Sequence, residues 1–142
     1  MSTESKESEA VIFEGVVNIP FTYAAGKTAS KFLLNLRDKK LLGKKCRCGK
    51  VFCPPRPICP ICFNAEEGEW IEMNGEGTLL SFTVVKSKNV LGIIKLDEAD
   101  NNFLHLLGGF SLDRLKVGMR VKVVFSDNRA GNILDIAYFT EV

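Results

Sequence analysis

The sequence predicts a mainly β protein with an N-terminal helical segment, a metal-binding ribbon and a C-terminal barrel of five strands. Three observations predict this fold class. Residues 28–42 place apolar side chains near helical spacing, all five cysteines fall between residues 46 and 62, and five short runs rich in β-branched and aromatic residues follow residue 77. We expect the three parts to cover residues 1–43, 44–74 and 75–142.

The N-terminus carries no sign of export or membrane insertion. Residues 1–10, MSTESKESEA, are polar and lack an apolar run behind a basic start. No later apolar run approaches the roughly 18 residues that a membrane-spanning helix needs. We therefore expect a cytoplasmic protein that does not enter a membrane.

The first part of the chain predicts an arm followed by a helix. Residues 11–25, VIFEGVVNIPFTYAA, are rich in apolar side chains without a clean period, which predicts an extended arm packed against this chain or against a partner. Residues 28–42, TASKFLLNLRDKKLL, predict an amphipathic helix that Thr28 or Ser30 caps and Gly43 ends. The apolar positions of this helix are Phe32, Leu33, Leu36 and Leu41.

A basic block overlaps the helix and the ribbon. Between Lys27 and Arg56 the sequence has ten Lys and Arg residues and a single acid, Asp38, whereas the rest of the chain carries a net charge of −7. Clustered cations attract phosphate-bearing partners, which include nucleic acids, nucleotides and coenzyme A. The alternative is a solvated polar face of the helix.

The cysteine spacing predicts a metal site. An odd number of thiols in a reducing compartment argues against structural disulfides. Cys46-x-Cys48 and Cys59-Pro-Ile-Cys62 form two close pairs about ten residues apart, and a hairpin between such pairs brings four sulfurs into a zinc ribbon with metal–sulfur distances of about 2.3 Å. We predict that these four cysteines bind zinc or iron, because thiolates alone do not distinguish the two metals.

Neighbouring residues support this interpretation. Gly49 allows the first turn to fold back and Pro60 stiffens the second turn. A redox Cys-x-x-Cys pair belongs at the start of a helix in a βαβ unit, and this pair lies instead in a proline-rich segment. Cys53 is left as a packed or partly exposed spare thiol, with replacement of Cys46 or Cys48 as a ligand as the alternative.

The C-terminal part predicts an OB-type barrel. Candidate strands cover residues 78–85, 91–96, 103–110, 120–125 and 132–139, and residues 111–118 form a helical turn that Gly118 ends. Five strands with a short helix between the third and the fourth have the order of an OB-fold, whose closure removes exposed strand edges.

These motifs together resemble a known family. The order FLLNL…LLGKKCRCGKVFCPPRPICPIC…WIEMNGEGTLLSFTVV…VGMRVKVVF, from about Phe21 to Phe139, is similar to the acyl-CoA-associated proteins that join a rubredoxin-like zinc ribbon to an OB-fold and were long named only as a domain of unknown function. The resemblance implies a non-catalytic companion of a thiolase or of hydroxymethylglutaryl-CoA synthase, in lipid, isoprenoid-precursor or polyketide-like metabolism.

The resemblance carries over to particular residues. The family's Cys-Gly falls on Cys48 and Gly49, its Pro-Pro-Arg on residues 54–56, and its last pair on Cys59 and Cys62. One residue, not two, separates the cysteines of the first pair. Phe63 stands where the family has a glycine after the last cysteine, so Phe63 is expected to take a backbone conformation that is uncommon for a side chain of its size.

No catalytic constellation is present in the sequence. It has no Ser, His and acid set, no HExxH and no phosphate-binding glycine loop. The single histidine, His105, lies within a predicted strand and is interpreted as a packed or edge residue. Four thiolate ligands leave the metal no open position for a substrate. We therefore expect a protein that is not an enzyme.

Three functions compete. The first is a scaffold subunit that binds acyl-CoA phosphates through Arg56, Lys27 and Lys31 and a partner enzyme through the arm. The second is an OB-fold nucleic-acid-binding protein with a structural zinc ribbon, but residues 78–142 carry eight basic against seven acidic residues and so lack a basic stripe. The third, a small hydrolase or thioesterase, lacks the residues that it would need.

Overall fold

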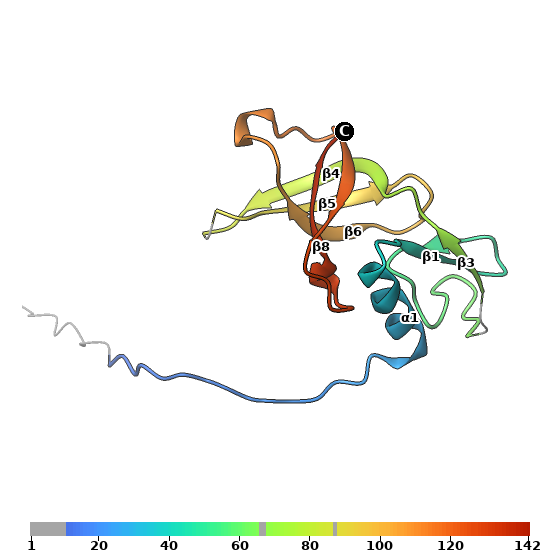
Figure 1. Cartoon of the computed structure of the whole chain (residues 1–142), viewed down its shortest axis with the longest axis horizontal. Helices are drawn as coiled ribbons and strands as arrows, with labels where there is room; N and C mark the ends of the chain where they lie inside the picture. The colour runs from blue at the N-terminus through green and yellow to red at the C-terminus, as the bar shows by residue number, and fades with distance from the viewer. Residues whose placement is uncertain (1–10, 66–67, 87) are drawn as a thin grey trace, which may run out of the picture.

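The structure, a computed structural model, describes residues 11–65, 68–86 and 88–142; the polar N-terminal ten residues lie outside these ranges. Within these ranges one α-helix, a three-stranded sheet and a closed barrel follow each other along the chain (Figure 1). This architecture confirms the predicted fold class. None of the helices in the described ranges has the length and the apolar character needed to span a lipid bilayer.

Helix α1, Gly26–Arg37, is displaced toward the N-terminus from the predicted range. Its N-cap is Ala25, which makes no side-chain capping bond, so neither Thr28 nor Ser30 caps it. The helix ends at Arg37 because Lys39 adopts a left-handed conformation with φ of 59°. This reversal frees residues 41 and 42 from the helix, and the next strand begins at Leu42.

The ribbon contains a small antiparallel sheet in the order β2-β1-β3. Its strands are β1 (Leu42–Lys45), β2 (Val51–Phe52) and β3 (Glu69–Glu72). Lys44 at the centre of this sheet pairs with Phe52 on one side and with Trp70 on the other. Strand β1 thus sets the position of both turns that hold the cysteines.

The barrel contains strands β4 (Glu76–Val84), β5 (Val90–Leu96), β6 (Phe103–Leu107), β7 (Arg120–Phe125) and β8 (Ile136–Glu141). The closed order is β4-β5-β6-β8-β7, in which β6 and β8 are parallel. A short 3-10 helix, η1 (Leu112–Arg114), lies between β6 and β7, as predicted. The last strand begins later than predicted because residues 133–135 form a second 3-10 helix, η2 (Ile133–Asp135).

A shared core and a polar loop join the ribbon to the barrel. Phe32 and Leu36 of α1 pack in the same buried cluster as Met73 and the barrel interior. The loop after β5 adds polar contacts: Asp100 accepts hydrogen bonds of 2.8 Å from Lys50 Nζ and from the Val51 amide. The next residue of the loop, Asn101, accepts a bond of 2.7 Å from the Cys53 amide. The barrel therefore holds the ribbon through residues about fifty positions away in sequence.

The arm, residues 11–24, is extended and runs away from the body of the protein (Figure 1). Its large apolar side chains are 73–95% exposed. These are Val11, Ile12, Phe13, Val16, Val17, Ile19, Phe21 and Tyr23. The sequence predicted that the arm packs either on this chain or on a partner. This degree of exposure does not fit packing on this chain.

Candidate metal centre

The first cysteine turn connects β1 to β2. The Cys46 amide donates to the Lys50 carbonyl over 2.7 Å, and the Gly49 amide donates to the Cys46 carbonyl over 2.9 Å. Gly49 has a φ of 86°, a conformation that glycine adopts without the penalty that a side chain would bring. The turn therefore closes although only Arg47 separates its two cysteines.

The second cysteine turn lies in the long loop between β2 and β3. The Phe63 amide donates to the Cys59 carbonyl, and the Cys59 amide donates to the Asn64 carbonyl, both over 2.9 Å. Phe63 has a φ of 56°, which confirms the unusual backbone conformation predicted for it. A non-glycine residue therefore occupies the position at which such turns favour glycine.

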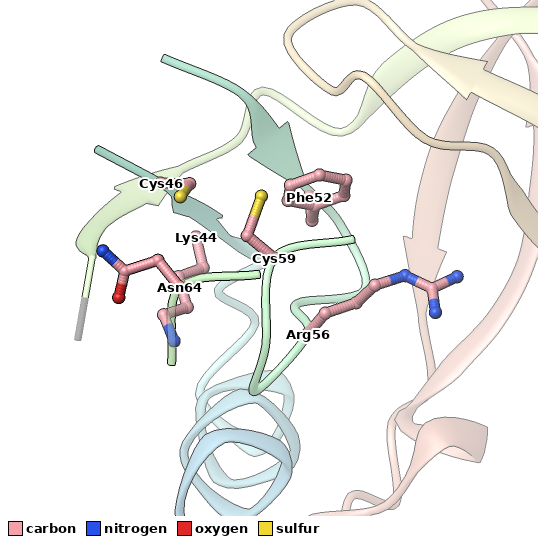
Figure 2. A pocket seen from close by; sticks show the side chains of 6 residues that line it. All are labelled: Lys44, Cys46, Phe52, Arg56, Cys59 and Asn64. Atoms are coloured by element: carbon pink, nitrogen blue, oxygen red, sulfur yellow. The ribbon is translucent and has the colours of Figure 1, made fainter. Parts of the chain in front are cut away.

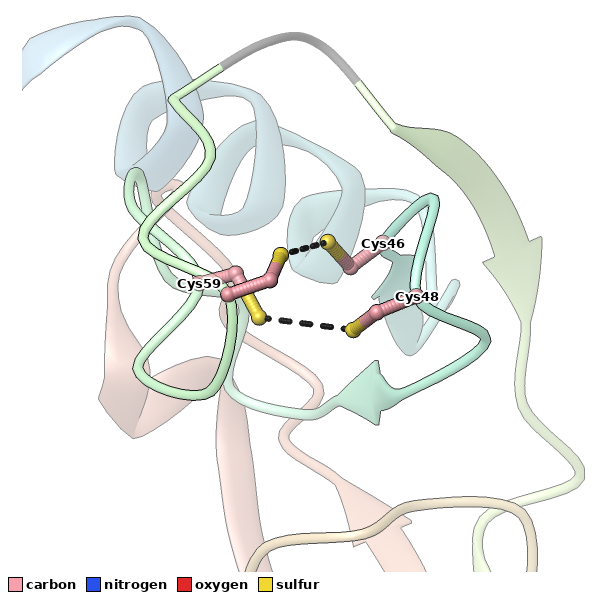
Figure 3. Close-up of side chains that lie close together, drawn as sticks. Cys46, Cys48 and Cys59 are labelled. Carbon is pink, nitrogen blue, oxygen red and sulfur yellow. Dashed lines mark hydrogen bonds between the residues drawn. The ribbon is translucent and has the colours of Figure 1, made fainter.

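The two turns bring the four predicted ligand sulfurs together. Cys46 Sγ lies 3.4 Å from Cys62 Sγ, and Cys48 Sγ lies 3.7 Å from Cys59 Sγ; the four sulfurs all lie within 4.8 Å of one another. Figure 3 shows the labelled side chains of Cys46, Cys48 and Cys59 converging from the two turns. A tetrahedron with metal–sulfur bonds of 2.3 Å has sulfur–sulfur edges of about 3.8 Å. The cluster therefore suits a four-coordinate metal ion.

The pKa values of the clustered thiols also favour the binding of a cation. Hydrogen bonds from the backbone amides of Cys62 and Ile61 help to lower the pKa of Cys59 to about 6. A hydrogen bond from the Asn64 amide favours the Cys62 thiolate. The contacts of the Cys62 thiol with the other three thiols, together with its partial desolvation, outweigh this bond and raise the pKa of Cys62 to about 12. Sulfurs this close cannot all ionise in the absence of a positive charge. A divalent cation between them supplies that charge.

Cys53 does not belong to the cluster. Its side chain is fully buried in the shared core, and this burial raises the pKa of the Cys53 thiol to about 12. A thiol that stays protonated in an apolar environment is a packing residue. The structure thus agrees with the prediction of a packed spare thiol and provides no support for the alternative that Cys53 replaces Cys46 or Cys48.

His105 is also a packed residue, as predicted. Its ring packs against the rings of Phe103 and Phe139, with centroid distances of 6.0 and 6.1 Å, and Nε2 lies 3.3 Å from the Ile133 carbonyl oxygen. Burial lowers the pKa of His105, so its neutral form is favoured. The side chain is 7% exposed, which leaves it little access to a substrate.

The predicted coenzyme A ligands lie on two different elements. Arg56 is exposed on the loop between β2 and β3, whereas Lys27 and Lys31 are exposed on the first half of α1. Lys31 Nζ lies 4.5 Å from the centroid of the Trp70 ring, a cation–π contact that ties α1 to the ribbon. Trp70 was not among the residues that the sequence singled out.

Arg56 also lines a small cavity together with Cys46 and Cys59. Lys44, Phe52 and Asn64 line the same cavity, and in Figure 2 the Arg56 side chain extends away from Lys44 and Asn64. Its volume of about 10 Å³ is enough for one water. A larger anion can therefore meet Arg56 only at the outer surface. The sequence did not single out Lys44 as buried; its position two residues after Leu42, on the same face of β1, was the available signal.

The cysteine cluster and the closed barrel define a class of protein in which a four-cysteine ribbon is joined to an OB barrel. Residues 70–126 match the family model described as the C-terminal OB-fold domain of ChsH2. A DUF35 domain-containing scaffold protein of Pyrococcus furiosus is 30% identical over 105 residues, which cover 67% of this chain and 76% of the relative. A scaffold protein of the same description from Methanocaldococcus jannaschii is 32% identical over 95 residues, covering 60% of this chain and 67% of the relative. The chain belongs to the family of DUF35 domain-containing scaffold proteins.

Solved structures confirm the fold. The structure titled Ltp2-ChsH2(DUF35) aldolase aligns with a TM-score of 0.65 and 18% identity, over 84% of this chain and 98% of the other chain. A DUF35-family protein of unknown function from Sulfolobus solfataricus aligns with a TM-score of 0.64 and 20% identity, over 82% of this chain and 87% of the other. These two structures bear on the fold, whereas the family model and the Pyrococcus furiosus relative confirm the family resemblance inferred from the cysteine and barrel motifs.

Proposed function

We propose that this protein is a non-catalytic scaffold subunit that binds acyl-CoA and associates with an enzyme of the thiolase or hydroxymethylglutaryl-CoA synthase type, in lipid, isoprenoid or polyketide-like metabolism. The observation that carries the proposal is the arm, whose eight large apolar side chains are 73–95% exposed. Burial of one such side chain contributes about 1.5–3 kcal/mol. A partner that covers several of them gains a large part of the free energy of a stable complex.

The metal in this proposal has a structural role. Cys46, Cys48, Cys59 and Cys62 supply four ligands to a zinc or iron ion, and four protein ligands saturate a tetrahedral ion. The ion would link the two cysteine turns. When bound, the ion therefore stabilises the fold of the ribbon.

Binding of acyl-CoA would use the exposed cations of the basic block. The Arg56 guanidinium presents paired N–H donors that match a phosphate group. Lys27 and Lys31 are four residues apart in α1 and can add point charges. The identity of the partner enzyme rests on the family resemblance, and the names of the relatives support a scaffold.

The barrel surface argues against the nucleic-acid alternative. Arg120 forms a two-bond contact with the Asp97 carboxylate, with both N–O distances 2.6 Å, and reaches Glu76 over 3.3 Å. Arg114 pairs with Glu141 over 2.7 Å. Cations neutralised within the chain contribute little to attracting a phosphate backbone.

The arm is tested by co-purification. The full chain and a chain lacking residues 1–21 are each mixed with the thiolase and with the hydroxymethylglutaryl-CoA synthase of the organism that supplies this chain. The full chain should retain one of the enzymes and the truncated chain should not, while the metal content and the barrel stay intact. Equal retention by both chains would contradict the role of the arm.

Coenzyme A binding is tested by calorimetry. Acyl-CoA should bind with an affinity that falls as salt rises, and should bind more weakly without its 3′-phosphate. Arg56→Ala should weaken binding, whereas the control Arg114→Ala, on the barrel, should not. Tighter binding of an arbitrary oligonucleotide would favour the nucleic-acid alternative. Hydrolysis of acyl-CoA by the pure chain, abolished by Arg56→Ala or His105→Ala, would show the scaffold proposal to be wrong.

A further inference from the structure

The second half of strand β4 is open along one edge. Strand β7 pairs with residues 76–78 of β4, and the backbones of Gly118 and Met119 add hydrogen bonds to Leu79. Over residues 80–84, the ladder partners of β4 within the described ranges come from β5 alone. All five of these residues are exposed, although one face of a barrel strand normally lies in the core. In Figure 1 this end of β4 projects from the barrel, away from the ribbon.

This open edge, residues 80–84, lacks the features that usually protect an edge strand. Its sequence, LSFTV, contains no charged residue and no proline. Exposed edges without such residues pair readily with another strand through their backbone N–H and C=O groups. The surface beside the edge also has a hollow of about 270 Å³. The hollow is lined by apolar and hydroxyl-bearing residues: Ser81, Phe82, Thr83, Leu91, Ile93 and Leu104. The edge therefore suits an extended peptide with apolar side chains.

The arm of the same protein has these properties. It is extended, and its large apolar side chains are 73–95% exposed. Residues 11–19, VIFEGVVNI, include five β-branched residues, which favour strands. Pro20 lacks the amide hydrogen that a ladder needs, so we expect an added strand to end before it.

The arm and the β4–β5 hairpin carry opposite charges. Residues 1–24 contain four acidic residues, of which Glu14 lies within the arm, and a single lysine. Residues 78–96 contain three lysines and no acidic residue. Lys86 and Lys88 are exposed near the turn of the hairpin, close to the open edge. Electrostatic attraction therefore favours an encounter between the arm and this hairpin.

The acidic residues that flank the hairpin in sequence lie at its opposite end. These residues are Glu76, Asp97, Glu98 and Asp100. Arg120 pairs with two of them and Lys50 with a third. Strand β5, with seven residues, separates them from the turn by about 20 Å, more than two Debye lengths at physiological salt. They therefore do not cancel the positive charge near the open edge.

The area of the arm is sufficient for a stable dimer. Each of its eight large apolar side chains offers on the order of 100 Å² of apolar surface. If one face of each arm is covered, two arms and the surfaces beneath them bury about 1,600 Å² in total, the size of a standard stable interface. A two-fold exchange also covers both open edges at once.

We propose that the arm of one copy pairs with the open edge of β4 in a second copy, so that two chains exchange arms in a symmetric dimer. The inference rests on the proposed function, in which the arm binds a partner enzyme, and it adds a regulation of that binding. An arm that is paired with a second copy is occupied, so dimer formation competes with enzyme binding. The backbone of an open edge selects a peptide over a lipid or a coenzyme, because only a peptide offers a matching row of donors and acceptors.

Sedimentation velocity at several protein concentrations measures the exchange. The full chain should form a dimer, and the chain lacking residues 1–21 should be a monomer. Thr83→Lys places a charge at an exposed position of the open edge and should raise the dissociation constant of the dimer at least about tenfold. This variant should keep its metal and its Tm. Its affinity for the purified thiolase or synthase should equal or exceed that of the wild-type chain, because its arm is free.

Charge reversal tests the same contact with independent variants. Glu14→Lys should weaken the dimer by about twofold to fivefold, as for the loss of an exposed attraction. Addition of Lys86→Glu and Lys88→Glu to Glu14→Lys should restore it, because the signs are again opposite. Lys40→Glu, at an exposed position beyond α1, is the matched control and should leave the dimer of the wild-type chain unchanged.

The outcomes separate this inference from the proposed function. A monomer at every concentration, or a dimer of unchanged stability in Thr83→Lys, would overturn the exchange and leave the proposed function standing. A monomer whose residues 11–19 lose amide protection in Thr83→Lys would show that the arm covers the edge of its own chain instead. Weaker enzyme binding by Thr83→Lys would assign the open edge to the enzyme. A dimer that responds as expected in a chain that binds neither enzyme would support the exchange and refute the proposed function.

Discussion

Replacement of Cys62 by serine is expected to remove the metal and to unfold the ribbon, while the barrel remains folded. Cys62 Sγ lies 3.4 Å from Cys46 Sγ, within the four-sulfur cluster. A serine hydroxyl ionises far less readily than a thiol and is a poor ligand for zinc. The variant therefore keeps only three thiolate ligands.

The structure indicates how large the effect should be. Between residues 46 and 64 the buried apolar side chains are Phe52, Cys53 and Cys59. Burial of a phenylalanine contributes about 3 kcal/mol at most, whereas a structural thiolate site contributes on the order of 10 kcal/mol to folding. Strand β2 has only two residues, so backbone pairing cannot compensate. Metal binding is therefore the dominant contribution in this segment.

Metal content per chain and amide hydrogen exchange measure the outcome. Cys62→Ser should contain far less than one metal per chain and should lose amide protection across residues 44–73, with the protection of residues 76–141 retained. The matched control is Cys53→Ala, which alters a buried thiol outside the cluster and should keep its metal. Full metal occupancy with unchanged protection in Cys62→Ser would refute the assignment of the site.

Three further predictions concern the barrel. Because burial lowers the pKa of His105 below its ordinary value of 6.5, the free energy of unfolding should fall as the pH decreases below about 6.5, and urea titrations of His105→Leu should lack this component. Burial would raise the pKa of Asp135, but the amides of residues 130–132 donate hydrogen bonds that lower it; Asp135→Asn should therefore cost about 2–3 kcal/mol in denaturant titrations, and an unchanged midpoint would contradict this role. A Cβ at Gly77 would collide with the Lys95 carbonyl oxygen, so Gly77→Ala should lower the Tm and reduce the free energy of unfolding by about 1–3 kcal/mol. An unchanged Tm would show that strands β4 and β5 can move apart to accommodate the methyl group.

Short-range patterns were sufficient for much of this protein. The thiol spacing predicted which four cysteines converge, because a turn of three to five residues brings its two ends together whatever surrounds it. Short runs rich in β-branched and aromatic residues, separated by turn signals, predicted the five barrel strands, since such side chains pack well on a pleated surface. The phenylalanine that stands where the resembling family has a glycine after its last cysteine likewise predicted the backbone of Phe63, which depends on that residue and its immediate neighbours.

Contacts between distant residues were decided only by the tertiary structure. The sequence did not indicate that Asp100 and Asn101 hold the ribbon, because they lie 47–50 positions from their partners. It misplaced the end of α1, where Lys39 takes a left-handed conformation without being a glycine and Leu42 begins a strand. The sequence left open whether Cys53 is packed or partly exposed, and its full burial in the core shared with the barrel decides this. Local spacing determines how a turn closes, but the burial or exposure of a side chain depends on which distant segment packs against it.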